Sequence, residues 1–313
     1  MKTTAVTSED LAASVLAVPP LAWNADFTLN RQANAAIVEH LQAGGVTTLM
    51  YGGNANFYNL GLADYAPVLE MLQALAAPET WVIPSVGPDY GKMMDQAAVL
   101  RDLDFPTAMV LPLSFPATPA GVEAGIRRFA AAYGKPVILY IKNQGYIEPE
   151  GAARLADDGL LCGIKYAIVR EDPAEDAFLS RLVELVDRGL IISGIGERPA
   201  PAHLRDFGLV GFTSGSVCIA PNASMAILRA LKAGDYARAL ALREAFIPFE
   251  DQRDAISPLR VLHEGVRLAG IAETGPLLPM LSGLEEHQVP AVERAAQELR
   301  AFDRELARKS AAA

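Results

Sequence analysis

The feature that most constrains the fold of this chain is a regular alternation of short apolar runs with helical patterns. Eight runs are each followed by a helical pattern, which is the order expected of parallel strands joined by helices. The runs are apolar without alternation, as is typical of strands that are covered on both faces. They lie at residues 14–18, 46–51, 81–86, 107–111, 137–139, 160–164, 190–193 and 210–213.

This alternation predicts the α/β class and, within it, a (β/α)8 TIM barrel. The alternative is an open doubly wound sheet that binds a dinucleotide. It is disfavoured because Gly52-Gly53 does not belong to a G-x-G-x-x-G sequence and no ribose-binding acid is evident.

Only helical patterns follow the last apolar run, at about residues 223–233, 235–249, 256–270 and 289–307. We therefore predict a barrel at residues 1–233 and a C-terminal helical extension at residues 234–313, packed on the barrel or on a partner subunit. The apolar character of residues 268–284 points to a homo-oligomer, a dimer or a tetramer.

Charge and composition exclude several classes of partner. The net charge of −10 argues against binding to nucleic acid or to an anionic membrane through a general field. Cys162 and Cys218 do not have the spacing of a metal site, and we expect two buried, reduced thiols and neither a metal nor a cofactor. The first 18 residues lack the pattern of a signal peptide, and no apolar run approaches the roughly 20 residues of a membrane span, so we expect a cytoplasmic protein.

The stretch from Pro136 to Lys165 contains the sharpest chemical signal. It reads as strand, helix and strand within about 30 residues, which places Tyr140 and Lys165 at the same, carboxyl end of neighbouring parallel strands. Burial lowers the pKa of a lysine, and its neutral amine then forms a Schiff base with a carbonyl compound. A tyrosine beside it can relay protons. The alternative is a lysine that reaches the barrel rim and pairs with a carboxylate.

A glycine turn follows the second apolar run and should lie on the same rim. Gly52 and Gly53 let backbone N–H groups approach a ligand, and the Asn54 amide adds a polar contact, so the turn can bind a carboxylate. The alternative is a tight turn without a ligand. A lysine for the oxo carbon and a turn for the adjacent carboxylate together predict a small-molecule 2-oxo acid as substrate. Gly194 and Thr213 would complete the wall; the alternative for each is an ordinary residue of a loop after a strand.

The segments GGNANFYNL, ILY and GIK, in this order from Val15 to about Pro221, resemble the dihydrodipicolinate synthase / N-acetylneuraminate lyase family of Schiff-base aldolases. The resemblance implies that Lys165 forms the Schiff base and that Tyr140 relays protons. It also implies roles in substrate binding for the residues at the family's pocket positions, Gly53, Asn54, Gly194 and Thr213.

Several residues depart from the family pattern. Asn54 stands where the synthases have a second threonine, and Asn56 where they have a glutamate. The loop IKNQGYIEP lacks the arginine that grips their second substrate, and Ser114 falls near the place of a tyrosine that a neighbouring subunit contributes. The pattern is more similar to the 5-dehydro-4-deoxyglucarate dehydratase branch, in which Lys142 would contact a sugar acid. The alternative for Lys142 is a solvated loop residue.

Three functions follow from these residues. The first is a lyase or aldolase that acts on a 2-oxo acid of the pyruvate type through an iminium at Lys165. The second is a dehydratase of a keto-deoxy sugar acid that uses the same iminium and expels water. The third is a barrel that binds a 2-oxo acid without catalysis, since fold alone does not guarantee function.

Overall fold

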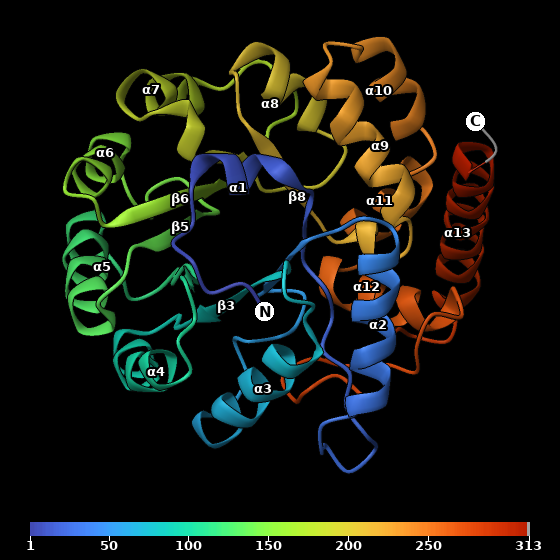
Figure 1. Cartoon of the computed structure of the whole chain (residues 1–313), viewed down its shortest axis with the longest axis horizontal. Helices are drawn as coiled ribbons and strands as arrows, with labels where there is room; N and C mark the ends of the chain where they lie inside the picture. The colour runs from blue at the N-terminus through green and yellow to red at the C-terminus, as the bar shows by residue number, and fades with distance from the viewer. Residues whose placement is uncertain (312–313) are drawn as a thin grey trace.

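The computed structural model describes residues 1–311 and forms a closed barrel of eight parallel strands (Figure 1). Each strand pairs with the next one along the chain, and β8 pairs with β1 to close the ring. The predicted (β/α)8 TIM barrel is confirmed. The strands are β1 (Leu16–Ala17), β2 (Thr48–Tyr51), β3 (Trp81–Val86), β4 (Met109–Val110), β5 (Val137–Ile141), β6 (Leu161–Tyr166), β7 (Ile191–Ser193) and β8 (Gly211–Ser214).

Helices connect the strands and surround the barrel (Figure 1). Several begin on a side-chain cap, with Asn30, Asp89 and Thr118 each accepting a hydrogen bond from the backbone N–H three residues later. The connecting helices are α2 (Arg31–Ala43), α3 (Leu62–Leu75), α4 (Tyr90–Asp102), α5 (Pro119–Tyr133), α6 (Pro149–Asp157), α7 (Ala177–Leu185) and α8 (Ala200–Asp206). Two 3-10 turns, η1 (Arg188–Leu190) and η2 (Ser216–Cys218), precede β7 and follow β8.

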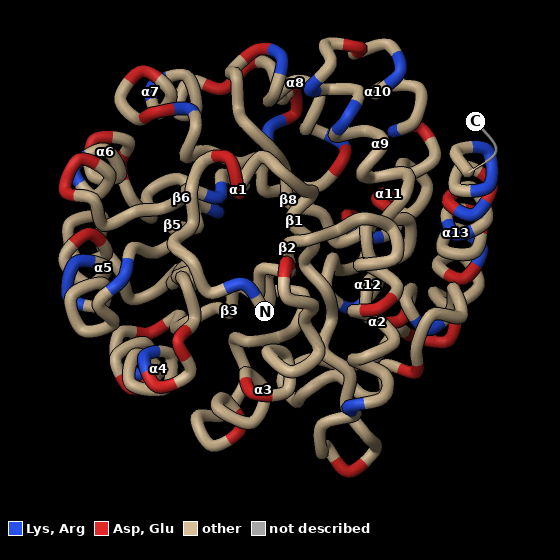
Figure 2. The backbone as a smooth tube through the Cα atoms, in the orientation of Figure 1, with Lys and Arg blue, Asp and Glu red and all other residues tan. Residues whose placement is uncertain are grey.

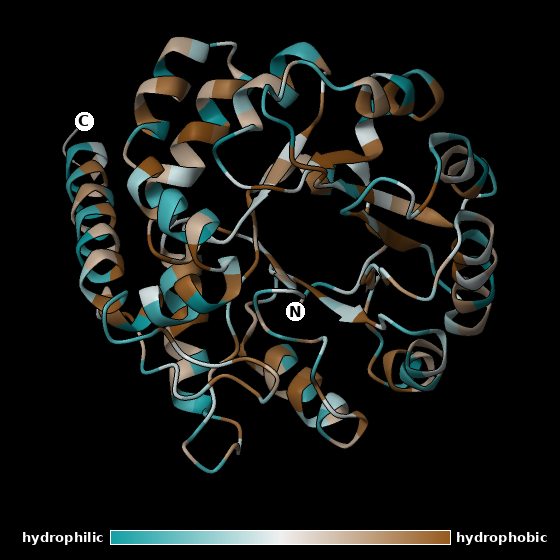
Figure 3. Cartoon of the chain, turned by 180° about the vertical axis from the view of Figure 1, so that it is seen from behind, coloured by the Kyte–Doolittle hydropathy of each residue, from teal (hydrophilic) through white to brown (hydrophobic). Residues whose placement is uncertain are grey.

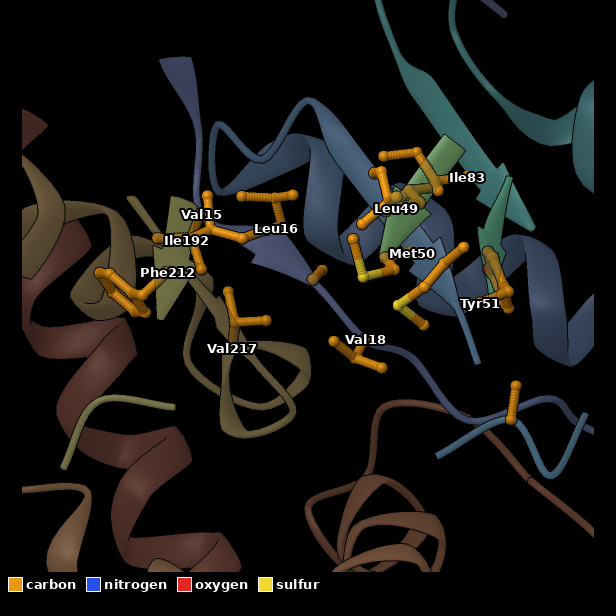
Figure 4. Packing of buried hydrophobic residues seen from close by; sticks show 14 of the residues in the cluster. Val15, Leu16, Val18, Leu49, Met50, Tyr51, Ile83, Ile192, Phe212 and Val217 are labelled. Carbon is orange, nitrogen blue, oxygen red and sulfur yellow. The ribbon is translucent and has the colours of Figure 1, made fainter. Parts of the chain in front are cut away.

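Apart from the partly buried Tyr140 in β5, every residue of the strands is buried, which explains their apolar composition. Side chains from β1, β2, β7 and β8 belong to one hydrophobic cluster, and Figure 4 shows Leu16, Met50 and Phe212 among them. Seen from behind, the hydrophobic colour gathers on the strands, while the outer helices carry hydrophilic residues (Figure 3). The barrel therefore contributes most of a single hydrophobic core.

The structure adds a helix that the sequence pattern does not predict, α1 (Ser8–Ala13). It begins with a capping box in which Thr7 and Asp10 bond reciprocally to each other's backbone N–H. Its Leu11 is buried, and a side chain on Gly211, at the start of β8, would begin 2.8 Å from the Leu11 carbonyl oxygen. Helix α1 therefore covers the amino-terminal end of the barrel.

The C-terminal helices pack beside α9 (Pro221–Lys232) on one side of the barrel (Figure 1). They are α10 (Tyr236–Arg243), α11 (Ile247–Ala255), α12 (Pro258–Leu268) and α13 (Val289–Ala311). The single helix expected at 235–249 is wrong, because Pro248 lacks a backbone N–H and its ring would clash with the carbonyl group of Glu244 in a continuous helix, so a new helix begins at Ile247. The division of the chain into units at residue 233 stays a prediction.

Helix α13 is joined to the barrel helix α9 through a buried carboxylate. Asp303 accepts hydrogen bonds from the Ala223 backbone N–H at 2.9 Å and from the Asn222 side-chain amide at 3.0 Å. The carboxylate therefore caps the first turn of α9, where backbone N–H groups lack partners within the helix. Elsewhere α13 carries many charged residues, like the other outer helices (Figure 2).

Both cysteines are buried free thiols, as predicted, and burial raises the pKa of each. Across residues 1–311, histidine, cysteine and acidic side chains do not gather into a group of three that could hold a metal ion. No helix within the same residues is both long enough and apolar enough to cross a membrane.

Self-association stays a prediction. Within residues 268–284, Leu277 is buried against the core while Met280 is 89% exposed. A separate open groove of about 570 Å³ is lined by Tyr90, Phe115 and Tyr146 among others. Phe115 is 86% exposed. Exposed apolar side chains of this size are common at contacts between subunits.

We predict that Asp303→Ala lowers the free energy of unfolding by about 2 kcal/mol, because the buried Ala223 N–H loses its acceptor. Urea unfolding measures the effect. Asp303→Asn keeps one acceptor oxygen and should cost less. Glu305→Ala, an exposed change on the same helix, is the matched control and should shift stability by less than about 0.5 kcal/mol. Equal effects for Asp303→Ala and Glu305→Ala would contradict the capping role.

Candidate functional site

A cavity of about 220 Å³ opens at the carboxyl ends of the barrel strands. Its walls come from segments that follow β1, β2, β5, β6, β7 and β8, and from helices α11 and α12. This is the end at which barrels of this kind carry out chemistry. Seven of the nine residues that the sequence predicts for the site line the cavity: Gly53, Asn54, Tyr140, Lys142, Lys165, Gly194 and Thr213.

Lys165 and Tyr140 meet across neighbouring strands. They are direct partners in the register of β5 and β6, and Lys165 Nζ lies 4.6 Å from the centre of the Tyr140 ring. Lys165 is 4% exposed, and within residues 1–311 its amine forms no ion pair with a carboxylate. The alternative of a rim lysine paired with a carboxylate therefore does not describe this side chain.

The surroundings of the two residues change their protonation. Burial lowers the pKa of Lys165 to about 7, and the positive charges of Lys142 and Arg253 act in the same direction. A large fraction of the amine is therefore neutral and nucleophilic at pH 7. Burial raises the pKa of the Tyr140 phenol, with a further contribution from Tyr58, so the phenol keeps its proton at neutral pH.

The turn after β2 borders the cavity and carries backbone N–H groups without acceptors. The N–H groups of Gly53 and Asn54 donate to no acceptor within residues 1–311. The Asn54 side-chain amide donates to the carbonyl oxygen of Val18 at 2.9 Å, which ties the turn to the end of β1. Two adjacent free N–H groups on a turn that is held in place are suited to binding a carboxylate.

Gly52 and Asn56 do not line the cavity. A side chain on Gly52 would begin 2.8 Å from Ser85 Oγ and 2.7 Å from Met109 Cε, so this glycine leaves room for packing inside the barrel. Asn56 has a left-handed φ of 55° and donates to the carbonyl oxygen of Leu278 at 3.3 Å. It connects the loop after β2 to the C-terminal segment, and the structure gives it no contact with the cavity.

Gly194 and Thr213 lie where the sequence predicts. A side chain on Gly194 would begin 2.9 Å from Lys165 Cγ and 2.7 Å from the Tyr166 carbonyl oxygen, so only glycine leaves room for the lysine stem. Thr213, in β8, is buried beside β1. Lys142, in the loop after β5, is exposed and borders the cavity.

The structure adds a polar wall that the sequence pattern does not reveal. Helix α11 presents Glu250, Arg253 and Asp254 to the cavity. Glu250 and Arg253 are buried and form an ion pair in which Arg253 Nη1 lies 2.9 Å from Glu250 Oε1. Charged residues on an amphipathic helix usually face solvent, so only the packing of α11 over the barrel identifies these three.

A further carboxyl group, that of Glu197, lies behind this wall. Glu197 is fully buried and accepts hydrogen bonds from the hydroxyl groups of Ser214 and Ser224. Burial, followed by the nearby Glu250 carboxylate, raises the pKa of Glu197 to about 7. The Glu197 carboxyl group is therefore partly protonated at neutral pH.

Comparison with known proteins supports the resemblance carried by the motifs. The family model described as the dihydrodipicolinate synthetase family matches residues 12–299. A probable 5-dehydro-4-deoxyglucarate dehydratase 1 of Streptomyces coelicolor is 25% identical over 261 residues, covering 79% of this chain and 80% of the relative. Its namesake in Streptomyces avermitilis is 24% identical over 302 residues, covering 91% and 94%.

Solved structures share the fold. Dihydrodipicolinate synthase from Oceanobacillus iheyensis superposes with a TM-score of 0.83 at 22% identity, covering 94% of this chain and 98% of that one. YagE from E. coli K12, solved in complex with pyruvate, gives a TM-score of 0.80 at 20% identity, covering 91% and 98%.

Because the pKa of Lys165 is lowered in the folded chain, the free energy of unfolding should depend on pH. Below pH 7 the amine is charged in both the folded and the unfolded chain, so the folded state bears the full free-energy cost of burying a charged group. The cost falls as the pH rises from about 7 to the ordinary pKa of 10.5. We expect Lys165→Met to raise the free energy of unfolding by roughly 2–4 kcal/mol at pH 6 and by little at pH 10.5.

Urea unfolding at pH 6, 8 and 10 measures this difference. Lys309→Met removes an exposed lysine of helix α13 that does not line the cavity and serves as the control, with a small effect that does not follow this pH trend. A Lys165→Met effect that stays constant across the pH range would contradict the buried, uncompensated amine.

Proposed function

Because this chain belongs to the dihydrodipicolinate synthetase family and is a lyase-type enzyme, we propose that it acts on a 2-oxo acid through an iminium formed on Lys165. The observation that carries the proposal is the Lys165 amine, which is buried, free of any ion pair within residues 1–311 and directed at Tyr140 in one cavity. A neutral amine in a closed site is the nucleophile that this chemistry needs.

In the proposed reaction, Lys165 Nζ attacks the oxo carbon, and the adduct loses water to form the iminium. The carboxylate next to the oxo carbon accepts hydrogen bonds from the free N–H groups of Gly53 and Asn54. The iminium then withdraws electrons from the neighbouring carbon, which lets that carbon lose a proton or a carbon substituent. Tyr140 moves the protons, since its phenol is protonated at neutral pH and lies beside the amine.

Within this chemistry we propose dehydration of a keto-deoxy sugar acid. Loss of a proton from carbon 3 gives an enamine, which expels the hydroxyl group of carbon 4 as water. Hydrolysis of the resulting iminium releases the product and the amine. The two Streptomyces relatives, described as probable 5-dehydro-4-deoxyglucarate dehydratases, support this reaction. So does the loop after Tyr140, which offers Lys142 and lacks an arginine.

We expect sodium borohydride to trap a covalent pyruvate adduct on Lys165, detected by mass spectrometry of the digested protein. Adduct formation should rise with pH along a curve with a midpoint of about 7, because the ammonium form below this pH cannot attack. Lys165→Ala should abolish the adduct, and Lys142→Met should retain it. Absence of an adduct with pyruvate and with several other 2-oxo acids would refute the proposal. Saturable binding that survives Lys165→Ala, without turnover, would identify a non-catalytic binder instead.

The role of Tyr140 is tested by Tyr140→Phe. Turnover of a keto-deoxy sugar acid should fall about 10²- to 10⁴-fold, while the variant keeps the aromatic ring beside Lys165. Product analysis of the wild-type reaction separates the two lyase reactions, since carbon–carbon cleavage releases an aldehyde together with pyruvate and dehydration does not. Turnover that is insensitive to the loss of the phenol would assign the proton relay to another group.

A further inference from the structure

Helix α11 carries a guanidinium group into the cavity that neither the barrel motifs nor the resemblance explains. Arg253 borders the same cavity as Lys165, and its charge contributes to the lowered pKa of that lysine. Lys142, Lys165 and Arg253 line the cavity together with Glu250 and Asp254, so charges of both signs meet there. Because Glu250 occupies part of the Arg253 guanidinium group, the nitrogens that remain free decide what this group can bind.

Arg253 is buried and firmly held. It is 8% exposed, its Nη1 donates to Glu250 Oε1 at 2.9 Å, and its Nε lies 3.5 Å from the Pro258 carbonyl oxygen. Glu250 in turn accepts a hydrogen bond from the Ser216 hydroxyl group. Glu250 and Ser216 therefore fix the direction in which the guanidinium group points.

One nitrogen of this guanidinium group remains available. Arg253 Nη2 donates to no acceptor within residues 1–311, so the ion pair with Glu250 uses only one arm of the planar fork. An arginine whose purpose is a stable ion pair commonly engages the carboxylate with both arms. The free arm is the one that a ligand in the cavity can use.

The free nitrogen lies beside the turn that follows β2. A side chain on Gly215 would begin 2.7 Å from Arg253 Nη2 and 2.8 Å from Asn54 Nδ2. The absence of a side chain at Gly215 therefore lets the guanidinium group and the Asn54 amide approach each other. The adjacent N–H groups of Gly53 and Asn54 are also without acceptors within residues 1–311.

We propose that Arg253 binds the carboxylate next to the oxo group of the substrate, together with the backbone N–H groups of Gly53 and Asn54. This proposal rests on the proposed function, because it assigns the charge partner of the 2-oxo acid at the same site. Glu250 acts as a positioning residue that orients Arg253. The C-terminal helices thus supply a donor at a turn where Gly53 and Asn54 have no hydroxyl group to offer.

Borohydride trapping with two matched probes tests the assignment. Pyruvate carries the carboxylate, and methyl pyruvate has the same oxo group without the charge. In the wild-type protein we expect pyruvate to be trapped at lower concentration than its ester. Arg253→Met should reduce this preference about 10- to 100-fold, the effect of one hydrogen bond to a charged group. Arg253→Lys keeps the charge but not the planar fork, and should retain part of the preference.

Arg243→Met is the control, because Arg243, the last residue of helix α10, forms an ion pair with the adjacent Glu244 and does not line the cavity. Its preference for pyruvate should equal that of the wild type. Thermal unfolding of each variant separates loss of fold from loss of binding. If Arg253→Met or Arg253→Lys lowers trapping of pyruvate and of its ester equally, the arginine is structural and the proposal is overturned.

A third probe, 2-oxoglutarate, carries a second carboxylate at its far end. Reduced trapping of 2-oxoglutarate by Arg253→Met, with no change for pyruvate, would place the arginine at the far end of the substrate and overturn the proposal. Failure of the wild-type protein to trap any oxo acid would refute the proposed function itself. Trapping by the wild type with an unchanged pyruvate preference in Arg253→Met would refute only the role of Arg253.

Discussion

The proposed chemistry depends on one energetically unfavourable feature, a lysine amine that is held away from water without a carboxylate partner. Removing a charge from water costs free energy, and here the cost appears as the lowered pKa of Lys165. The surrounding barrel can sustain this cost because its strands are buried on both faces and form a large apolar core. Helix α1 covers the amino-terminal end, so the cavity that holds the amine opens at the carboxyl end.

Glycines rather than polar residues make much of the room for the chemistry. Gly194 allows the stem of Lys165 to pass close to β7, and Gly215 allows Arg253 to approach the turn after β2. In each case the closest atoms lie less than 3 Å from where a side chain would begin, so a larger residue would displace a charged group. Lys165 and Arg253 can therefore occupy their positions because Gly194 and Gly215 have no side chain.

The segments GGNANFYNL, ILY and GIK occur in the order that the family shows, but the first of them lacks the side-chain hydroxyl groups of the family's turn. Gly53 and Asn54 retain the backbone donors of a carboxylate-binding turn without side-chain hydroxyl groups. Helix α11 brings a buried guanidinium group to the same place. The C-terminal helices therefore have a part in the composition of the cavity and do not merely cover the barrel.

Local pattern was sufficient for the barrel and for seven of the nineteen residues that line the cavity. Eight apolar runs alternating with helices have one closed parallel arrangement, and parallel pairing of β5 with β6 necessarily brings Tyr140 beside Lys165. The glycine turn lies on the same rim for the same reason. Gly52 and Asn56 could not be separated from Gly53 and Asn54 in this way, since adjacent residues of a turn point in different directions.

What the sequence by itself determined is the order of strands and helices and the residues that end each strand, because these follow from hydrophobic periodicity and from the geometry of parallel pairing. Only the tertiary structure decided that the amine has no carboxylate partner within residues 1–311, and that Glu250, Arg253 and Asp254 line the cavity. The physical reason is that the burial of Lys165 and the approach of helix α11 to the cavity depend on how elements more than 80 residues apart pack, and local sequence patterns carry no record of that packing.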